Sequence, residues 1–337
     1  MKSMKQSNCL LYLCMLAALW LAGCTPGKKG KVLVEKRSTG LPFEVVVVSE
    51  TKYWKSILGE RLRDELEKPY PALPQREATS RISYCEPYHF NGLMRYVRNI
   101  LIVDIDDKVY TQTKLVSEND VWASAQLVLR LQSPSSVDLE KYLIERGDTL
   151  NTLIRQSEQQ RYVAYLADYH SSFVDKSARE QFHLRVHAPE GFDSFKEDSL
   201  FLWVSNNANS GRMDMVFYDF PAESEQDLAI PHLIAMRDSV MKRNILGSFD
   251  GSYMTTEKRV DVQGETIKEG QSPSILIRGL WRVEGDMMGG PFVSRALFDK
   301  ARHRVVVAEG FVYAPETNKK NYMHRLESSL RTVRLLP

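Results

Sequence analysis

The feature that most limits this chain is a short apolar stretch near its N-terminus. Residues 9–23 are almost entirely apolar and follow the basic residues Lys2 and Lys5. A stretch of about 15 residues is too short to span a membrane as a helix, which needs roughly 20. A basic start followed by a short apolar segment is typical of a secretory signal that is cleaved. We therefore expect residues 1–23 to be a signal peptide and the folded protein to come from the rest of the chain.

The end of this stretch, Leu21-Ala22-Gly23-Cys24, resembles the processing site of bacterial lipoproteins. The resemblance implies cleavage before Cys24 and attachment of lipid chains, palmitate among them, to its sulfur and new amino terminus. Position 25 is Thr, whereas by resemblance to lipoprotein sorting signals an Asp there favours the inner membrane. The acidic run that accompanies surface export in some groups is also missing. These features predict a lipid anchor at Cys24 in the outer membrane, with the protein facing the periplasm.

Charge and cysteine usage exclude two classes of protein. The chain has 45 basic and 43 acidic residues, and loss of the two signal-peptide lysines leaves a formally neutral protein. Nucleic-acid binding needs clustered Lys and Arg, so we expect no nucleic-acid partner. With Cys9 and Cys14 in the signal and Cys24 acylated, only Cys85 remains, which excludes an intramolecular disulfide. We expect Cys85 to be a buried small residue rather than a reactive thiol.

Hydrophobic patterning predicts an α+β fold of two sheet-and-helix halves, with mainly antiparallel sheets and covering helices. Four consecutive valines within Phe43–Ser49 predict a strand buried on both faces. Apolar residues at helical spacing from Trp54 to Lys68 predict a helix beside it. The remaining length favours two domains over one core. The expected divisions are a tether at 24–40, an N-terminal α+β domain at 41–135, a helical connector at 136–170 and a C-terminal α+β domain at 171–337.

The connector shows a long amphipathic pattern that opens with a serine suitable as a cap. A glycine costs roughly 1 kcal/mol in a helix interior, so Gly147-Asp148 leaves two alternatives, one long helix or a helical hairpin. Beyond it we expect a helix near Pro231–Arg243, a polar connection from there to Ser274, and a final helix near Asn321–Arg331. The strands expected in this half are Gln181–His187, Ser199–Ser205, Met213–Asp219, Ile275–Glu284, Pro291–Asp299 and Arg304–Tyr313.

Six short patterns are spread over nearly the whole mature chain. They are Arg98-Asn99-Ile100-Leu101-Ile102-Val103, Arg237-Asp238-Ser239, Gly251-Ser252-Tyr253-Met254, Arg278-Gly279-Leu280-Trp281, Met288-Gly289-Gly290-Pro291-Phe292-Val293 and Gly310-Phe311-Val312-Tyr313-Ala314-Pro315. With these patterns the chain resembles an uncharacterised family of Bacteroidetes lipoproteins, a domain-of-unknown-function family. The resemblance implies export and lipidation. It brings no reaction, ligand or catalytic residue with it.

Two groups of residues carry metal-binding chemistry in their side chains. His183 and His187 would share one face of an expected strand, where they could ligate a metal. A solvated sheet face explains them better because no third ligand is near in sequence. Asp104, Asp106 and Asp107 follow a buried strand, where carboxylates can hold a cation or act as acid and base. Their spacing lacks the glycine and distal glutamate of a calcium loop, which favours a charged loop. We expect no metal and no cofactor.

Charges also lie within apolar strands near the C-terminus. Glu309, Arg295 and Arg278 each stand between apolar residues that would share their face of a strand. A lone buried charge is costly, so these groups should form an internal pair, face water, or line a polar binding groove. Gly289 and Gly290 would let a backbone approach closely at the mouth of the hairpin there, or form only a tight turn or a bulge. These five residues are the candidate groove of the sequence.

No catalytic motif accompanies these features. The chain has no Gly-x-Ser-x-Gly elbow and no phosphate-binding loop. We therefore expect a non-catalytic binding or scaffolding lipoprotein, a monomer or part of an envelope complex, whose partner is an envelope protein or glycan. The alternative is a hydrolase of envelope polymers or peptides that uses carboxylates such as Asp104, Asp106 or Glu309.

Overall fold

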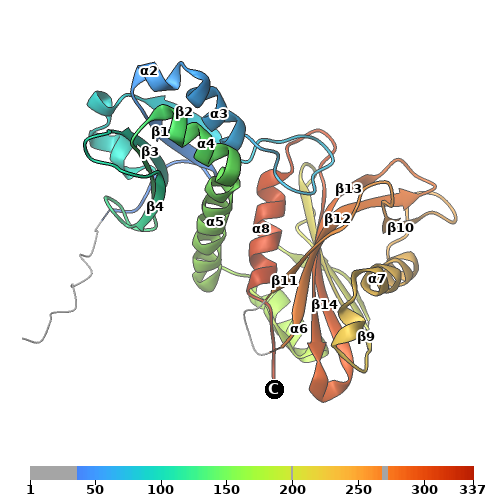
Figure 1. Ribbon diagram of the computed structural model, residues 1–337. Coiled ribbons are helices and arrows are strands. Elements are labelled where there is room, and N and C mark those ends of the chain that lie inside the picture. The colour runs from blue at the N-terminus through green and yellow to red at the C-terminus, as the bar shows by residue number, and fades with distance from the viewer. Residues whose placement is uncertain (1–35, 199, 268–271) are drawn as a thin grey trace, which may run out of the picture. The chain divides into compact units, whose positions relative to one another are not determined.

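Two main β-sheets and the helices packed on them make up most of the described chain (Figure 1). The computed structural model describes residues 36–198, 200–267 and 272–337. The expected signal peptide, Cys24 and most of the expected tether lie outside these residues. None of the described helices is long and apolar enough to cross a membrane. The α+β fold class is confirmed.

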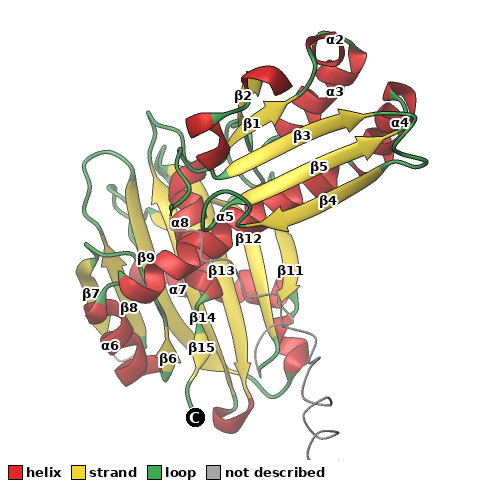
Figure 2. Cartoon of the chain, turned by 90° about the vertical axis from the view of Figure 1, so that its left-hand side faces the viewer, coloured by secondary structure: helices red, strands yellow, loops and turns green. Residues whose placement is uncertain are grey.

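The first sheet has five strands: β1 (Glu44–Val48), β2 (Arg81–Cys85), β3 (Asn99–Ile105), β4 (Lys114–Asn119) and β5 (Leu127–Ser133). Their order is β2-β1-β3-β5-β4, and the last three lie side by side in Figure 2. The first four strands in this order are parallel, and β4 pairs with β5 antiparallel. This sheet therefore differs from the mainly antiparallel pairing of the whole protein. All four valines of β1 are buried, two on each face, as the sequence predicts.

Helices cover one face of this sheet: α2 (Thr51–Trp54), α3 (Ile57–Leu66) and α4 (Ser136–Arg146). Leu58, Leu62 and Leu66 of α3 are fully buried in one core with Val45 and Val47. The opposite face is covered by two 3-10 helices, Pro87–His89 and Gly92–Tyr96. Burial on both faces explains why these parallel strands are almost continuously apolar.

The connector is two helices, α4 and α5 (Asp148–Asp168), which meet at Gly147, so it is not the single long helix that the sequence left as one alternative. The side chain of Ser135 caps α4 by accepting a hydrogen bond from the Asp138 N–H. A Cβ atom at Gly147 would lie 2.5 Å from the backbone carbonyl oxygen of Leu143. This close approach of the backbone favours the glycine that ends α4.

The second sheet has eight strands: β7 (Asp193–Asp198), β8 (Phe201–Ser205), β9 (Arg212–Pro221), β10 (Tyr253–Thr256), β11 (Gln263–Ile267), β12 (Ser274–Glu284), β13 (Gly289–Asp299) and β14 (Arg304–Tyr313). All its pairings are antiparallel, in the order β10-β12-β13-β14-β9-β8-β7, and β11 also pairs with β12. The predicted strands Ile275–Glu284, Pro291–Asp299 and Arg304–Tyr313 are confirmed within two residues at each end.

Helices lie on both faces of this sheet: α6 (Ser172–Phe182), α7 (Ile230–Asn244) and α8 (Lys320–Arg331). α7 packs on one face, over a core that contains Phe292 and Phe311. α6 and α8 pack on the other face, and their core continues without a break into the core of the first sheet. A two-stranded sheet of β6 (Leu184–Arg185) and β15 (Arg334–Leu335) follows. The separation into domains at 41–135 and 171–337 stays a prediction.

The sequence misses several elements and misplaces one strand. The elements absent from the predictions are short or have few apolar residues, and they are α6, β2, β4, β7, β10, β11 and β15. The predicted strand Gln181–His187 is wrong, since α6 continues to Phe182 and His183 then ends it in the left-handed conformation at φ 54°. Only two residues of that stretch pair as β6.

A buried ion pair joins α7 to the second sheet. The Arg237 guanidinium donates to both carboxylate oxygens of Glu309 at 2.7–3.0 Å and to the Thr256 hydroxyl at 3.0 Å. Its carbon Cζ lies 4.0 Å from the centre of the Phe292 ring. Both charged side chains are 2% exposed or less. Glu309 is therefore paired inside the protein, with a partner on a helix rather than on a neighbouring strand.

Glu309→Ala should destabilise the protein by about 3–5 kcal/mol, because it leaves the Arg237 charge buried without its carboxylate. Glu284→Ala removes one partner of a surface pair with Arg282 and should cost less than about 1 kcal/mol. Urea unfolding of both variants measures the two losses. A loss below about 1 kcal/mol for Glu309→Ala would contradict the buried pair.

Candidate functional site

The candidate site is built where α5 lies against α8, and one buried carboxylate joins them. Glu327 of α8 is 1% exposed. Its Oε1 accepts hydrogen bonds from Gln159 Nε2 of α5 and from Arg278 Nη2 of β12, both at 2.5 Å. Burial alone would raise the pKa of Glu327, but the charge and hydrogen bonds of Arg278 lower it to about 2. A carboxylate that Arg278 keeps ionised at neutral pH therefore links two helices to the second sheet.

Glu265 of β11 extends this network toward the surface. Its carboxylate accepts from Arg278 Nη2 at 2.9 Å and from Arg331 Nη2 at 2.8 Å, while its side chain is 42% exposed. Burial would raise the pKa of Glu265, but the hydrogen bonds from Arg331 and Arg278 hold it below its ordinary value. Two arginines and two glutamates thus alternate from the interior to the surface.

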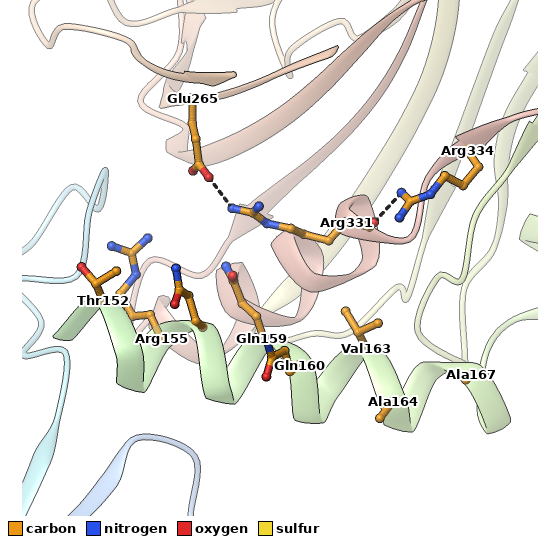
Figure 3. Close-up of a pocket in the computed structure, with 11 residues that line it drawn as sticks. Thr152, Arg155, Gln159, Gln160, Val163, Ala164, Ala167, Glu265, Arg331 and Arg334 are labelled. Atoms are coloured by element: carbon orange, nitrogen blue, oxygen red, sulfur yellow. Dashed lines mark hydrogen bonds and ion pairs between the residues drawn. The ribbon is translucent and has the colours of Figure 1, made fainter. Parts of the chain in front are cut away.

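A cleft of about 730 Å³ opens beside this network (Figure 3). We call it the α5 cleft, because most of its lining comes from α5. Figure 3 shows Glu265, Arg331 and Arg334 facing the α5 side chains from the opposite wall. Its size lies in the range of small-molecule sites. The lining residues are Thr152, Arg155, Gln156, Gln159, Gln160, Val163, Ala164, Ala167, Glu265, Arg331 and Arg334.

The lining of the α5 cleft is cationic. It contains three arginines and one carboxylate, and that carboxylate is already bound to Arg331. Arg155 stacks over the Tyr70 ring with its Cζ 5.6 Å from the ring centre. The buried Nε atoms of Arg155 and Arg331 have no hydrogen-bond partner in the described part of the chain. Among the described residues Arg331 is paired with carboxylates, whereas the other two lining arginines, Arg155 and Arg334, have no carboxylate partner within 4 Å and remain available to an anion.

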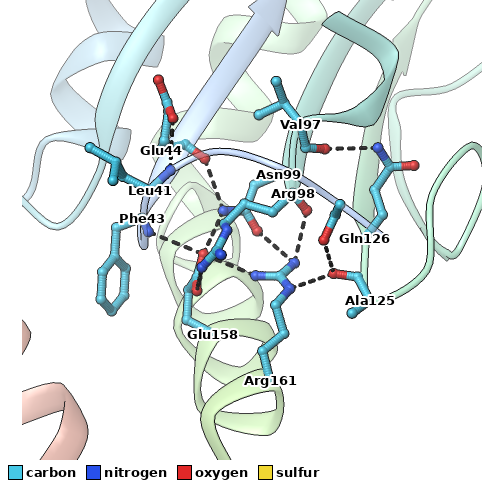
Figure 4. Close-up of polar contacts among 11 residues, drawn as sticks. Leu41, Phe43, Glu44, Val97, Arg98, Asn99, Ala125, Gln126, Glu158 and Arg161 are labelled. Carbon is cyan, nitrogen blue, oxygen red and sulfur yellow. Dashed lines mark hydrogen bonds and ion pairs between the residues drawn. The ribbon is translucent and has the colours of Figure 1, made fainter. Parts of the chain in front are cut away.

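A second buried network fixes α5 to the first sheet (Figure 4). Glu158 of α5 accepts hydrogen bonds from the Phe43 N–H at 3.1 Å and from Asn99 Nδ2 at 2.8 Å. Arg98 and Arg161 pair with the same carboxylate at 3.0 and 2.9 Å. Burial would raise the pKa of Glu158, but the charges of Arg161 and Arg98 keep it below its ordinary value. α5 is therefore held on one side by Glu158 and on the other by Gln159.

The charged residues of the sequence-predicted groove do not meet in one groove. The register pairs Leu276 with Arg295 and Arg278 with Val293, so both arginines face α8. Glu309 faces α7 from the opposite side of the sheet. Arg295 donates to the backbone carbonyls of Leu330 and Arg331 at 3.0 and 3.2 Å, at the C-terminus of α8. The prediction of one groove is therefore corrected: the three charged side chains make separate buried contacts on the two faces of the second sheet.

Gly289 and Gly290 lie at the start of β13, beside a shallow hollow lined by Trp281 and Arg259 among others. A Cβ atom at Gly290 would lie 2.1 Å from the Val312 carbonyl oxygen. The close approach that this glycine allows is therefore to the neighbouring strand. The two glycines are apart from the α5 cleft, whose lining does not include them.

The other sequence candidates are also apart from the α5 cleft. His187 stacks on His170 with ring centres 4.2 Å apart, and His183 ends α6. The three aspartates are exposed, with Asp104 accepting from the Tyr110 hydroxyl at 2.5 Å. In the described chain no group of three or more His, Cys, Asp or Glu side chains could hold a metal. Cys85 is buried, as the sequence predicts, and burial raises the pKa of its thiol.

Sequence reasoning missed the α5 cleft, since its arginines and glutamines look like the solvated face of an amphipathic helix. The signal that was present is the run Arg155-Gln156-Ser157-Glu158-Gln159-Gln160-Arg161, in which polar residues occupy every helical face. A helix segment that is polar on every side needs solvent or polar partner groups on each of its faces. Here Glu158 has its polar partners at the first sheet, and Gln159 has its partner, Glu327, on α8.

Comparison with protein families agrees with the resemblance at a coarse level. Residues 38–166 match the model described as Domain of unknown function (DUF8532), and residues 171–332 match Domain of unknown function (DUF4837). The two matches meet between α5 and α6. Each match covers less than half of the chain, and the two support a relationship to domain-of-unknown-function families without bringing an activity or a site. No curated protein matches the sequence significantly.

Solved structures add no argument about function. The Ran-binding protein Mog1p of Saccharomyces cerevisiae is 8% identical, with a TM-score of 0.31 over 46% of this chain and 90% of its own. A mutant of protein Mog1 is also 8% identical, with a TM-score of 0.30 over 46% of this chain and 91% of its own. Similarity this low carries no argument about fold or role.

A buried histidine beside the site makes stability depend on pH. His324 of α8 packs against Phe43, with ring centres 4.9 Å apart, and burial lowers its pKa to about 4. The unfolded chain binds a proton near pH 6.5, whereas the folded protein does so only near pH 4. The difference in proton binding between the two states has no effect on stability at neutral pH. As the pH falls through 6.5 toward 4, it progressively lowers the free energy of unfolding.

Between pH 7.5 and 5.0 the His324 contribution should cost the wild-type protein about 2 kcal/mol of stability. His324→Phe removes the titrating ring and should lose correspondingly less stability over this interval. His89→Gln, at an exposed histidine, should behave as wild type. Urea unfolding at both pH values measures the difference. Identical pH dependence in His324→Phe and wild type would refute the buried neutral histidine.

Proposed function

We propose that this protein, whose two parts match uncharacterised families, is a non-catalytic binding lipoprotein of the bacterial cell envelope. Its anchor is the lipid on Cys24, in the outer membrane and facing the periplasm, and its ligand site is the α5 cleft. The observation that carries the proposal is the cleft itself, with arginine and glutamine side chains on its walls. The anchor rests on the sequence of residues 21–24.

The chemistry of the α5 cleft supports binding rather than turnover. Its only carboxylate lining group among the described residues is Glu265, which arginines hold in the ionised form at neutral pH. An acid catalyst needs a pKa near the working pH, which the pairing of Glu265 opposes. The described lining includes neither a histidine nor a cysteine nor a serine. Guanidinium and amide groups instead provide hydrogen bonds to a bound ligand.

The alternative, a hydrolase of envelope polymers or peptides, gains no support from its proposed carboxylates. Glu309 is fully buried against Arg237, which leaves no access for a substrate. Asp104 and Asp106 are exposed and bonded within their own loop, to Tyr110 and Lys108. They belong to the first sheet and Glu309 to the second, so these groups form no common acid–base site.

The ligand site is tested by site-specific photocrosslinking in living cells. A photoreactive residue at Ala164, inside the α5 cleft, should form an adduct with an envelope component. The matched control at Lys176, an exposed position of α6 outside the cleft, should not. Equal adducts at both positions, no adduct at either, or turnover of an envelope polymer by the purified protein would each count against a binding site in the cleft.

The anchor is tested by metabolic labelling with an alkyne analogue of palmitate. Wild-type protein should be labelled, and Cys24→Ser should not, because the acylated sulfur and the processing site are lost. Cys14→Ser, within the apolar segment, serves as the control and should keep its label. Label on Cys24→Ser equal to that on wild type, or none on wild type, would exclude Cys24 as the anchor.

A further inference from the structure

We propose that the α5 cleft binds an acidic oligosaccharide, an extended chain of sugars that carry carboxylates, and that Glu265 occupies one of its anion positions when no ligand is bound. The inference rests on the proposed function and adds the chemical class of the ligand. It follows from the length, the charge and the remaining polar groups of the cleft.

The α5 cleft is long. Its lining on α5 runs from Thr152 to Ala167, which is roughly 22 Å at 1.5 Å per residue. Arg155 lies near one end, Arg331 faces the middle, and Arg334 lies toward the other end (Figure 3). A compact anion would contact only one of these groups. The spacing of the arginines therefore fits an extended ligand with repeated negative charges.

The arginines at the two ends are available to carboxylates. Arg334 is exposed, and among the described residues its Nη1 donates to the backbone carbonyls of Arg331 and Val333, at 2.9 and 2.7 Å. In the described chain, neither Arg334 nor Arg155 has a carboxylate partner within 4 Å. A guanidinium group matches the two oxygens of a carboxylate with parallel hydrogen bonds. Both ends of the cleft can therefore bind an acidic group in this way.

The groups between the arginines favour sugars over an acidic peptide. Gln156 and Gln160 are exposed, and their amides both donate and accept, as hydroxyl groups require. The apolar part of the described lining is limited to three small side chains, Val163, Ala164 and Ala167, of which the two alanines are exposed. Peptide recognition usually depends on pockets for large anchor side chains. An acidic saccharide, with hydroxyl and carboxylate groups along its length, can form hydrogen bonds with more of the lining side chains than an acidic peptide can.

Glu265 behaves as an internal substitute for a ligand carboxylate. It is bound to Arg331 at 2.8 Å and is still 42% exposed. Its other partner, Arg278, also pairs with the buried Glu327 and so keeps a carboxylate if Glu265 moves away. A ligand carboxylate can thus replace Glu265 at Arg331. Loss of the Glu265 charge should make the cleft a stronger anion site.

Calorimetry on the full lipidated protein in detergent micelles tests this inference. The probes are tetrasaccharides of galacturonate and of mannuronate, their neutral methyl esters, and hexaglutamate as the acidic peptide. We expect at least one acidic tetrasaccharide to bind, and its ester and hexaglutamate to bind far more weakly. Arg334→Gln and Arg155→Gln should each weaken binding about tenfold, the loss of one charge-assisted contact.

Glu265→Gln gives the sharpest result because it should tighten binding severalfold, where a merely disruptive change would weaken it. The matched control is Glu257→Gln, which removes a carboxylate paired with Arg259 outside the cleft and should leave affinity unchanged. Unchanged or weaker binding by Glu265→Gln would overturn the claim that Glu265 occupies an anion position of the ligand. Preference for hexaglutamate, or binding of neither acidic tetrasaccharide, would overturn the saccharide class. If the saccharide class fails but the photocrosslinked adduct at Ala164 is still formed, the proposed binding function stands. If no adduct is formed either, both the binding function and the ligand class are overturned.

Discussion

The structure depends on one buried carboxylate, that of Glu327. It lies where α5, α8 and β12 meet, and it is bonded to Gln159 and Arg278 at 2.5 Å. Removing one partner of a buried charge pair costs about 3–5 kcal/mol, because the other charge loses its compensation without regaining water. This contact therefore fixes the position of α5 against the second sheet far more strictly than apolar packing alone would. Hydrophobic contacts tolerate a small slide of one helix along another, whereas hydrogen bonds of this length do not.

The fixed position of α5 explains why the cleft beside it is both polar and open. Glu158, one residue before Gln159, is bonded to the first sheet through Arg98 and Asn99, so α5 is held from two directions. Side chains that point between these two attachments, among them Gln160 and Ala164, line the cleft. Arg331, one turn beyond Glu327 on α8, is held at the opposite wall by Glu265. The network that stabilises the fold thus also supplies the charge of the proposed site.

The long strands could be predicted from the sequence, and the site could not. Apolar runs such as the four valines of β1 specify a strand by themselves, since burial on both faces needs no knowledge of the neighbours. Arg278, Arg295 and Glu309 were recognised as charges that need partners. Their partners come from α7 and α8, so sequence spacing could not identify them. α6 and β11 were missed because they have few apolar residues, and Glu265 belongs to β11. A cleft whose walls come from segments as far apart in sequence as α5, β11 and α8 leaves no local pattern.

The most direct test of this account is a crystal structure of the protein with a uronate tetrasaccharide bound. We predict that ligand carboxylates lie on Arg155 and Arg334, that Glu265 has left Arg331, and that the Glu327 contacts to Gln159 and Arg278 are unchanged. A ligand bound outside the α5 cleft, or one bound with Glu265 still on Arg331, would contradict the central claim that a fixed charge network prepares this cleft for an anionic ligand.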